Sequence, residues 1–192
     1  MSSPDGTNWT ERNCTVSAIL IDICSMSNAG TTKFVAVGHD THGFISTNGT
    51  TFTDVTMPDH DWQSVCYSEE LDLLVAVGAS GAVATNAAGG TTWVERTSTA
   101  DVWWKSVCWS AELTLFVAVA STGDIMTSAN GIAWESQTGA AAGVAWDSVE
   151  WSSVMGIFMA VSLDQKCMMS QDGVHWQLVY TPAGYAWENI CW

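Results

Sequence analysis

The sequence predicts an all-β fold, a β-propeller of four-stranded antiparallel blades. Three observations support this prediction. A tryptophan-led strand motif recurs at a nearly constant interval, a second apolar strand recurs in phase with it, and an Asp-Gly or Asn-Gly turn closes most copies. Four strands in about 42 residues is the repeat length of a propeller blade. No segment shows the 3.6-residue apolar period of an amphipathic helix.

The first strand of each copy follows the pattern Trp-x-Ser-Val-Cys or a close variant of it. Its tryptophans are Trp62, Trp104, Trp146 and Trp187, so the last interval is one position shorter than the two before it. A further step of that shorter interval toward the N-terminus leads to Ile21, which we expect in the tryptophan's place in the first copy. Five copies of this strand are therefore predicted.

The second strand of each copy is short and apolar, with the pattern Phe-Val-Ala-Val or a close variant, followed by Gly, Ala or Ser. Its copies lie at 34–38, 74–78, 116–120 and 158–162. A short apolar run without alternation is typical of a strand that is buried on both faces. We therefore expect these strands in the middle of each blade.

A turn motif joins the last two strands of each copy, at 3–9, 46–52, 128–134 and 170–176, with a decayed copy at 87–93. An Asp-Gly or Asn-Gly pair is a turn signal, in which the acid or amide accepts from backbone N–H groups and the glycine takes a positive φ. The aromatic residue that ends each copy is expected to pack between blades. The set with this structural role is Asp5, Gly6, Trp9, Asn48, Gly49, Phe52, Gly90, Trp93, Asn130, Gly131, Trp134, Asp172, Gly173 and Trp176.

One propeller domain over 1–192 is predicted, with four complete blades and a split partial fifth. The complete repeats cover about 19–57, 60–97, 102–138 and 144–180, and the partial blade consists of strands within 2–13 and 185–192. Three arrangements remain open. Four blades close and the extra strands are appended, a partner chain supplies the missing strands, or the chain is an excerpt of a longer repeat array. The end of the sequence inside the first-strand motif favours the last two.

The turn motif resembles the Asp-box of sialidase-like repeat proteins. The unit from Trp104 to Trp134 resembles the tandem propeller repeats of phage tail or fibre proteins and of large DNA viruses. This resemblance covers 2–192 and implies a propeller fold, which is reused for many purposes. It departs from the Asp-box pattern in one respect, because Asp5-Gly6 and Asp172-Gly173 are adjacent where one residue usually separates the Asp from the Gly. The turn is therefore a shortened variant.

Composition excludes several classes of function. Five Lys and Arg against twenty Asp and Glu give a net charge of −15, and 47% of the residues are hydrophobic. Scattered cations cannot neutralise a phosphate backbone or an anionic membrane surface, so no nucleic-acid partner is expected. No apolar run has the length of a bilayer span, and no signal peptide is visible. We expect a globular protein that is virion-associated or assembled in a cytosol.

Catalysis is not expected. Sialidases use three arginines to hold the substrate carboxylate, and this chain has two, Arg12 and Arg96. Carboxylates are plentiful, so a glycoside hydrolase is kept as a weaker alternative, although no pair stands out by its spacing. A photosystem-type propeller assembly factor would be expected to carry a basic patch, which this chain lacks.

No cofactor and no metal site are expected. Four of the six cysteines, Cys24, Cys66, Cys108 and Cys191, share one position of the first-strand motif and are predicted to be small buried hydrophobes. Equivalent positions in neighbouring blades are too far apart for a disulfide. The remaining cysteines are Cys14 and Cys167.

The first functional hypothesis is a non-catalytic module that binds a glycan or a surface protein through loops at one end of the propeller. Trp103 and Tyr185 are additional to the repeat and are candidate stacking groups. His39, His42 and His60 lie in or beside predicted loops and are further candidates for ligand binding. The alternative is a structural propeller that forms oligomers through its unpaired terminal strands.

Overall fold

The structure is a computed structural model that describes residues 1–3, 5–12, 18–28, 30–39, 41–87, 90–179 and 185–192. Its sixteen strands form four antiparallel sheets of four strands each, in chain order. The first two sheets are β1 (Leu20–Asn28), β2 (Thr31–Gly38), β3 (His42–Ser46), β4 (Thr53–Thr56), and β5 (Trp62–Ser68), β6 (Leu73–Gly78), β7 (Val83–Ala87), β8 (Val94–Arg96). The last two are β9 (Trp104–Ser110), β10 (Leu115–Ala120), β11 (Ile125–Ser128), β12 (Glu135–Gln137), and β13 (Ser148–Ser152), β14 (Ile157–Val161), β15 (Cys167–Ser170), β16 (Gln177–Val179).

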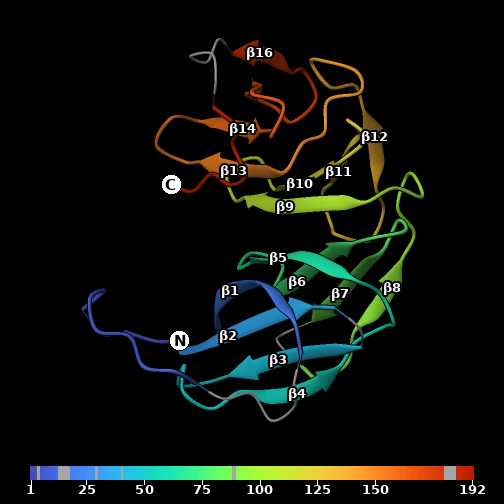
Figure 1. Ribbon diagram of the computed structural model, residues 1–192. Coiled ribbons are helices and arrows are strands. Elements are labelled where there is room, and N and C mark those ends of the chain that lie inside the picture. The colour runs from blue at the N-terminus through green and yellow to red at the C-terminus, as the bar shows by residue number, and fades with distance from the viewer. Residues whose placement is uncertain (4, 13–17, 29, 40, 88–89, 180–184) are drawn as a thin grey trace.

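The sheets are propeller blades, and the predicted all-β propeller is confirmed. The inner strands β1, β5, β9 and β13 pack side by side in chain order. No comparable packing joins β13 back to β1 among the described residues. The four blades therefore form an open arc, with β1 and β13 on opposite sides of the opening (Figure 1). Within the described part of the chain there is no helix with the length and hydropathy of a membrane span.

Hydrophobic clusters lie between successive blades. The second strands β6 and β10 are buried on both faces, as predicted from their unbroken apolar runs. The side chains of Trp62, Trp104 and Trp146 are fully buried at the start of the inner strands. Each tryptophan contributes to a cluster with apolar residues of the preceding blade, so burial of these large side chains joins neighbouring blades.

The first blade differs from the prediction by one residue. Leu20 pairs with Gly38 in β2 as Trp62 pairs with Gly78 in β6, and an irregular register follows each pair. Leu20, and not Ile21, therefore takes the tryptophan's place. The interval from Leu20 to Trp62 equals the one from Trp62 to Trp104, and the prediction was wrong because it used the shorter interval that precedes Trp187.

The turn units have a common hydrogen-bond pattern. Asn130 Oδ1 accepts from the backbone N–H groups of Ile132 and Ala133, both at 2.9 Å. Ser128 Oγ accepts from the N–H of Gly131, whose φ is 69°. The same pattern surrounds three other side chains, those of Asp5, Asn48 and Asp172. Hydrogen bonds from backbone N–H groups and from the side chain of the residue three positions on hold the pKa values of the carboxyls of Asp5 and Asp172 well below their usual range.

The turn at Gly90 departs from this pattern. Gly90 does not have the positive φ that was expected for it. The Asn86 side-chain amide instead donates to the carbonyl oxygens of Gly90 and Thr92, at 2.8 and 3.0 Å. This copy lacks the acid or amide just before its glycine, so the amide at the end of β7 holds the turn from the other side.

The terminal segments carry little regular structure. Ser2 and Thr10 form an isolated antiparallel bridge that closes the N-terminal turn unit. Residues 185–192 are not a strand, because none of the described residues pairs with them as a neighbouring strand of the same sheet. Two contacts still place them beside β13: the Trp187 N–H donates to the Ser162 carbonyl at 3.2 Å, and the Ile190 N–H donates to Ser148 Oγ at 3.4 Å.

The inner strands are linked by one side-chain hydrogen bond per blade, which we call the inter-blade ladder. The acceptor is the third residue of one copy of the first-strand motif, and the donor is the backbone N–H of the fourth residue in the next copy. The four bonds are Val65 N to Asp22 Oδ2 at 2.9 Å, Val107 N to Ser64 Oγ at 3.3 Å, Val149 N to Ser106 Oγ at 3.1 Å, and Ile190 N to Ser148 Oγ at 3.4 Å. Each bond pairs a backbone group that faces the neighbouring blade.

We expect Ser106→Ala to lower the free energy of unfolding by about 1–3 kcal/mol, because the buried Val149 N–H loses its acceptor. Urea denaturation followed by tryptophan fluorescence measures this change. The control is Ser136→Ala on the exposed face of β12, which should change stability by less than about 0.5 kcal/mol. Equal effects of the two variants would show that the ladder does not stabilise the blade interface.

Candidate functional site

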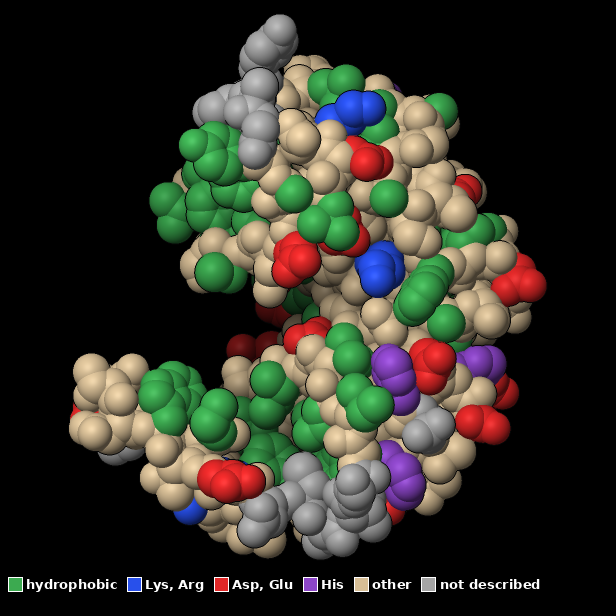
Figure 2. Space-filling model, in the orientation of Figure 1, with side chains coloured by type: hydrophobic (Ala, Val, Ile, Leu, Met, Phe, Trp, Pro, Cys, Tyr) green, Lys and Arg blue, Asp and Glu red, His purple; other side chains and the backbone are tan. Residues whose placement is uncertain are grey.

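A cleft of about 810 Å³ runs along the inner strands of all four blades. Its lining comes from β1, β5, β9 and β13 together with Asp147, Leu163 and residues 188–191. Figure 2 shows the opening of the arc as a deep hollow with acidic side chains at its inner end. The cleft is the one place in the described structure where side chains from every blade converge, so we take it as the candidate site.

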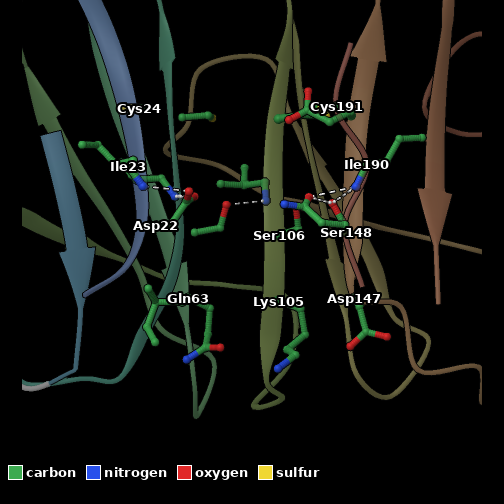
Figure 3. Close-up of a pocket in the computed structure, with 18 of the residues that line it drawn as sticks. Asp22, Ile23, Cys24, Gln63, Lys105, Ser106, Asp147, Ser148, Ile190 and Cys191 are labelled. Carbon is green, nitrogen blue, oxygen red and sulfur yellow. Dashed lines mark hydrogen bonds between the residues drawn. The ribbon is translucent and has the colours of Figure 1, made fainter. Parts of the chain in front are cut away.

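The cleft is lined by rows of side chains from equivalent repeat positions, and the rows differ in how strictly they repeat. The third and fourth motif positions are nearly uniform, since they form the inter-blade ladder. The second position differs in every blade, and we call it the variable row. Its members, all of which line the cleft, are Ile21, Gln63, Lys105, Asp147 and Glu188. Figure 3 shows Gln63, Lys105 and Asp147 pointing toward the same end of the cleft.

The cleft is predominantly acidic. Among the described lining residues Lys105 is the only lysine or arginine, against the carboxyls of Asp22, Asp147, Glu150 and Glu188. The Lys105 ammonium lies over the Trp103 ring, 4.5 Å from its centroid. This cation–π contact draws the positive charge toward the rim.

Two of the carboxylates hold backbone groups in place. Asp22 accepts from the N–H groups of Ile23 and Val65 at 2.8 and 2.9 Å, so it belongs to the ladder. Asp147 Oδ2 accepts from the N–H of Leu163 at 2.9 Å. That bond fixes the Asp147 carboxylate at the mouth of the cleft.

A second deviation from the repeat lies at the fifth position of the first-strand motif, beyond the inter-blade ladder. Glu150 stands where the other inner strands carry Cys24, Cys66 and Cys108. Burial raises the pKa of Glu150 from 4.5 to about 7, and the charge of Asp22 adds to this shift. Burial also raises the pKa of Cys24 to about 12 and the pKa values of Cys66 and Cys108 well above 9.0, so these thiols stay protonated at neutral pH.

The predicted stacking residues both precede a copy of the first-strand motif, and only the copy after Trp103 forms a strand. Trp103 is exposed and immediately precedes β9, where its carbonyl accepts from the N–H of Ser121 at 3.0 Å. Tyr185 is exposed, and its ring centroid lies 6.4 Å from that of Trp187. Trp103 contacts Lys105, which lines the cleft. Tyr185 and Trp187 precede Glu188, which is the last member of the variable row.

The structure does not bring the candidate histidines into one site. His42 Nδ1 lies 2.7 Å from Asp54 Oδ1, and His60 Nε2 lies 2.8 Å from Glu95 Oε1. His39 Nδ1 lies 3.8 Å from a carboxylate oxygen of Asp61. None of these histidines lines the cleft. Within the described residues no group of three or more His, Cys, Asp or Glu side chains could hold a metal ion.

The cysteines of the described chain are free thiols with different exposure. Cys108 and Cys167 are buried, Cys24 and Cys66 are half-buried, and Cys191 is exposed. The expectation of small buried side chains therefore fails for Cys191, because no further blade covers it. Cys14 lies outside the described residues.

The sequence did contain a signal for the variable row. Aligning the five copies of the first strand shows one position that differs in every copy, between positions that barely change. A structural residue is needed in every blade, whereas a group that contacts a ligand is needed in one. What the alignment lacked was the direction of these side chains, which decides that they face a common cleft.

No family model and no curated protein matches this chain. Solved structures do match, and those named below are β-propellers that resemble this chain in fold alone, at 11–15% identity. One is YCF48 bound to D1 peptide, with a TM-score of 0.66, 15% identity, and coverage of 86% of this chain and 54% of that chain.

Two further structures match at similar coverage. The WD40 β-propeller domain of Doa1 gives a TM-score of 0.61 at 13% identity, covering 85% of this chain and 54% of that chain. A catalytically inactive virginiamycin B lyase from Staphylococcus aureus with quinupristin gives a TM-score of 0.72 at 11% identity, and the match covers 85% of this chain and 56% of that chain. The chain thus spans about half the length of the structures that it matches.

The raised pKa of Glu150 predicts a pH dependence of stability. A carboxyl with a folded-state pKa above its unfolded value stabilises the fold at low pH, and this contribution is lost as the pH rises from 4.5 to about 7. We expect Glu150→Gln to flatten this decline and to be more stable than the unsubstituted chain at alkaline pH, by on the order of 1–3 kcal/mol. Urea denaturation from acidic to alkaline pH measures the effect.

Glu135→Gln on β12 is the matched control for Glu150→Gln, since Glu135 is exposed and outside the cleft. It should leave the pH profile unchanged. If Glu150→Gln also leaves it unchanged, Glu150 is not the group that titrates.

Proposed function

We propose that this chain is a non-catalytic binding module whose central cleft holds a cationic segment of a partner protein. The observation that carries the proposal is the variable row, because its side chains differ from blade to blade at a place where all blades meet. Positions that only maintain the fold repeat in each blade, as the inter-blade ladder does. A row that does not repeat is expected of a surface that recognises an asymmetric ligand.

The charge of the cleft supports a cationic ligand. Asp147 and Glu188 are the last two members of the variable row, and Glu150 also lines the cleft. The only lining cation among the described residues, Lys105, is held at the Trp103 ring. The low local dielectric of a cleft strengthens attraction between these carboxylates and a basic side chain. The net charge of −15 steers cationic partners toward the protein at long range.

The choice of a protein segment over a glycan rests on Trp103. Stacking of a sugar ring needs a free aromatic face, and the Lys105 ammonium occupies one face of the Trp103 ring. A solved propeller of similar fold, YCF48, holds a D1 peptide, which is a precedent for peptide binding by this architecture and no more. Adhesion to a glycan and association with a virus or phage stay predictions.

Binding is tested with a fluorescein-labelled octalysine peptide, with octaglutamate as the negative probe, by fluorescence anisotropy of the full chain. We expect saturable binding of octalysine that weakens at least about tenfold in the double variant Asp147→Asn, Glu188→Gln. The same loss of charge outside the cleft, Asp59→Asn with Glu135→Gln, should have a much smaller effect.

Two outcomes would contradict the proposal. Equal weakening by both double variants would mean that the peptide responds only to net charge. Specific hits on a glycan array that disappear in Trp103→Ala, with no peptide binding, would replace the protein ligand with a carbohydrate.

A further inference from the structure

The first blade presents a face that the other blades bury. Ile23 on β1 is 53% exposed, while its equivalents Val65, Val107 and Val149 are 4%, 4% and 0% exposed. Each of these valines packs in a cluster with apolar residues of the blade before it. The β1 side of the arc is therefore one half of the interface that the repeat forms three times inside the chain.

The fourth blade and residues 187–192 together present the other half of that interface, since Ile190 already donates to Ser148 as Val149 donates to Ser106. Met169 on β15 is 36% exposed, whereas its equivalents Thr127 and Thr85 are 4% and 2% exposed under the next blade. The C-terminal residues 187–192 contact this blade through Ser148 on β13 and through the Ser162 carbonyl after β14. Figure 2 shows hydrophobic side chains on both walls of the opening.

The described residues of the N-terminal turn unit, 2–3 and 5–10, form the turn hydrogen bonds, but the turn glycine, Gly6, does not pack on any described residue of a blade. In the inner blades the turn glycine is pressed onto the preceding blade: a Cβ on Gly173 would stand 2.8 Å from Leu115 and 3.2 Å from Val117. A Cβ on Gly6 would meet nothing within 4 Å. Ile157 and Met159 on β14 are the repeat equivalents of Leu115 and Val117. By the same repeat geometry, Gly6 would pack on Ile157 and Met159 of a fourth blade.

The ends of the inter-blade ladder match in the same way. Asn189 occupies the position of the accepting serine, and its Oδ1 accepts from the following N–H, that of Ile190. At the other end, the N–H of Ile23 donates to the carboxylate of its own neighbour, Asp22. Ile23 is the repeat equivalent of Ile190 and Val149, so Asn189 and Ile23 stand at the acceptor and donor positions of the ladder at the two ends of the arc.

We propose that two copies of this chain close one propeller ring head to tail, with the first blade and the Ser2–Thr10 unit of each copy covering the fourth blade and residues 187–192 of the other. A second copy is the occupant because the chain itself carries both halves of the interface. Head-to-tail contacts that close give a ring with two equal interfaces.

The two-copy ring does not depend on which ligand the cleft binds, and the molecular mass of the protein in solution tests it. Sedimentation equilibrium of the full chain should give twice the chain mass of 20.6 kDa. Added salt should strengthen association, because it screens repulsion between two chains of charge −15. A mass of 20.6 kDa at all concentrations and salt levels, or open-ended polymers, would overturn the two-copy ring.

Substitutions on the two faces test the geometry. Ile23→Glu and Met169→Glu should each weaken association at least about tenfold with circular dichroism unchanged. Ile132→Glu is the matched control, because Ile132 is 48% exposed on a turn of the third blade, away from the opening. An equal effect of Ile132→Glu would overturn the assignment of the faces.

A mixture of the two variants separates head-to-tail from face-to-face pairing. In a head-to-tail pair of one Ile23→Glu copy and one Met169→Glu copy, one interface is unsubstituted. Mixing should therefore restore part of the association that each variant alone has lost. No recovery on mixing, with both variants folded, would contradict the head-to-tail ring.

Discussion

Neighbouring blades of this propeller diverge from one another, so the backbone hydrogen bonds of one sheet cannot continue into the next. A short polar side chain on each inner strand solves this problem by accepting the N–H that faces it across the blade boundary. Ser64 and Ser106 do so with a hydroxyl, and Asp22 with a carboxylate. Because this bond fixes how far apart the inner strands stand, it also sets the width of the cleft and aligns equivalent residues into rows.

The rows separate two kinds of constraint. Residues that form the ladder, the turn units and the tryptophan layer are repeated because each blade boundary needs them. The variable row and Glu150 are not repeated, although they lie among residues that are. Glu150 occupies a position that holds cysteine in the other inner strands, and burial of its carboxyl there raises its pKa. Under the proposed function, the residues that depart from the repeat are the ones that contact the ligand.

The opening of the arc has two consequences, one for the candidate site and one for the faces of the first and fourth blades. It leaves the cleft accessible along its whole length, and it leaves Ile23 and Met169 without the cover that their repeat equivalents have. A cationic segment in the cleft and a second copy on the blade faces would both contact Ile23 and residues 188–190, which line the cleft and belong to the proposed interface. Asp147 belongs to the cleft alone, and Met169 belongs to the proposed interface alone.

The sequence by itself determined the strand order, the blade count and the turn units, because each is encoded in short spacings that repeat along the chain. It placed the first inner strand one residue off, since Leu20 gives no aromatic marker. It also favoured His39, His42 and His60, which the fold separates onto different carboxylates. Only the tertiary structure decided that the arc stays open and that the variable row faces one cleft, because both depend on the angle between blades, which no local spacing records.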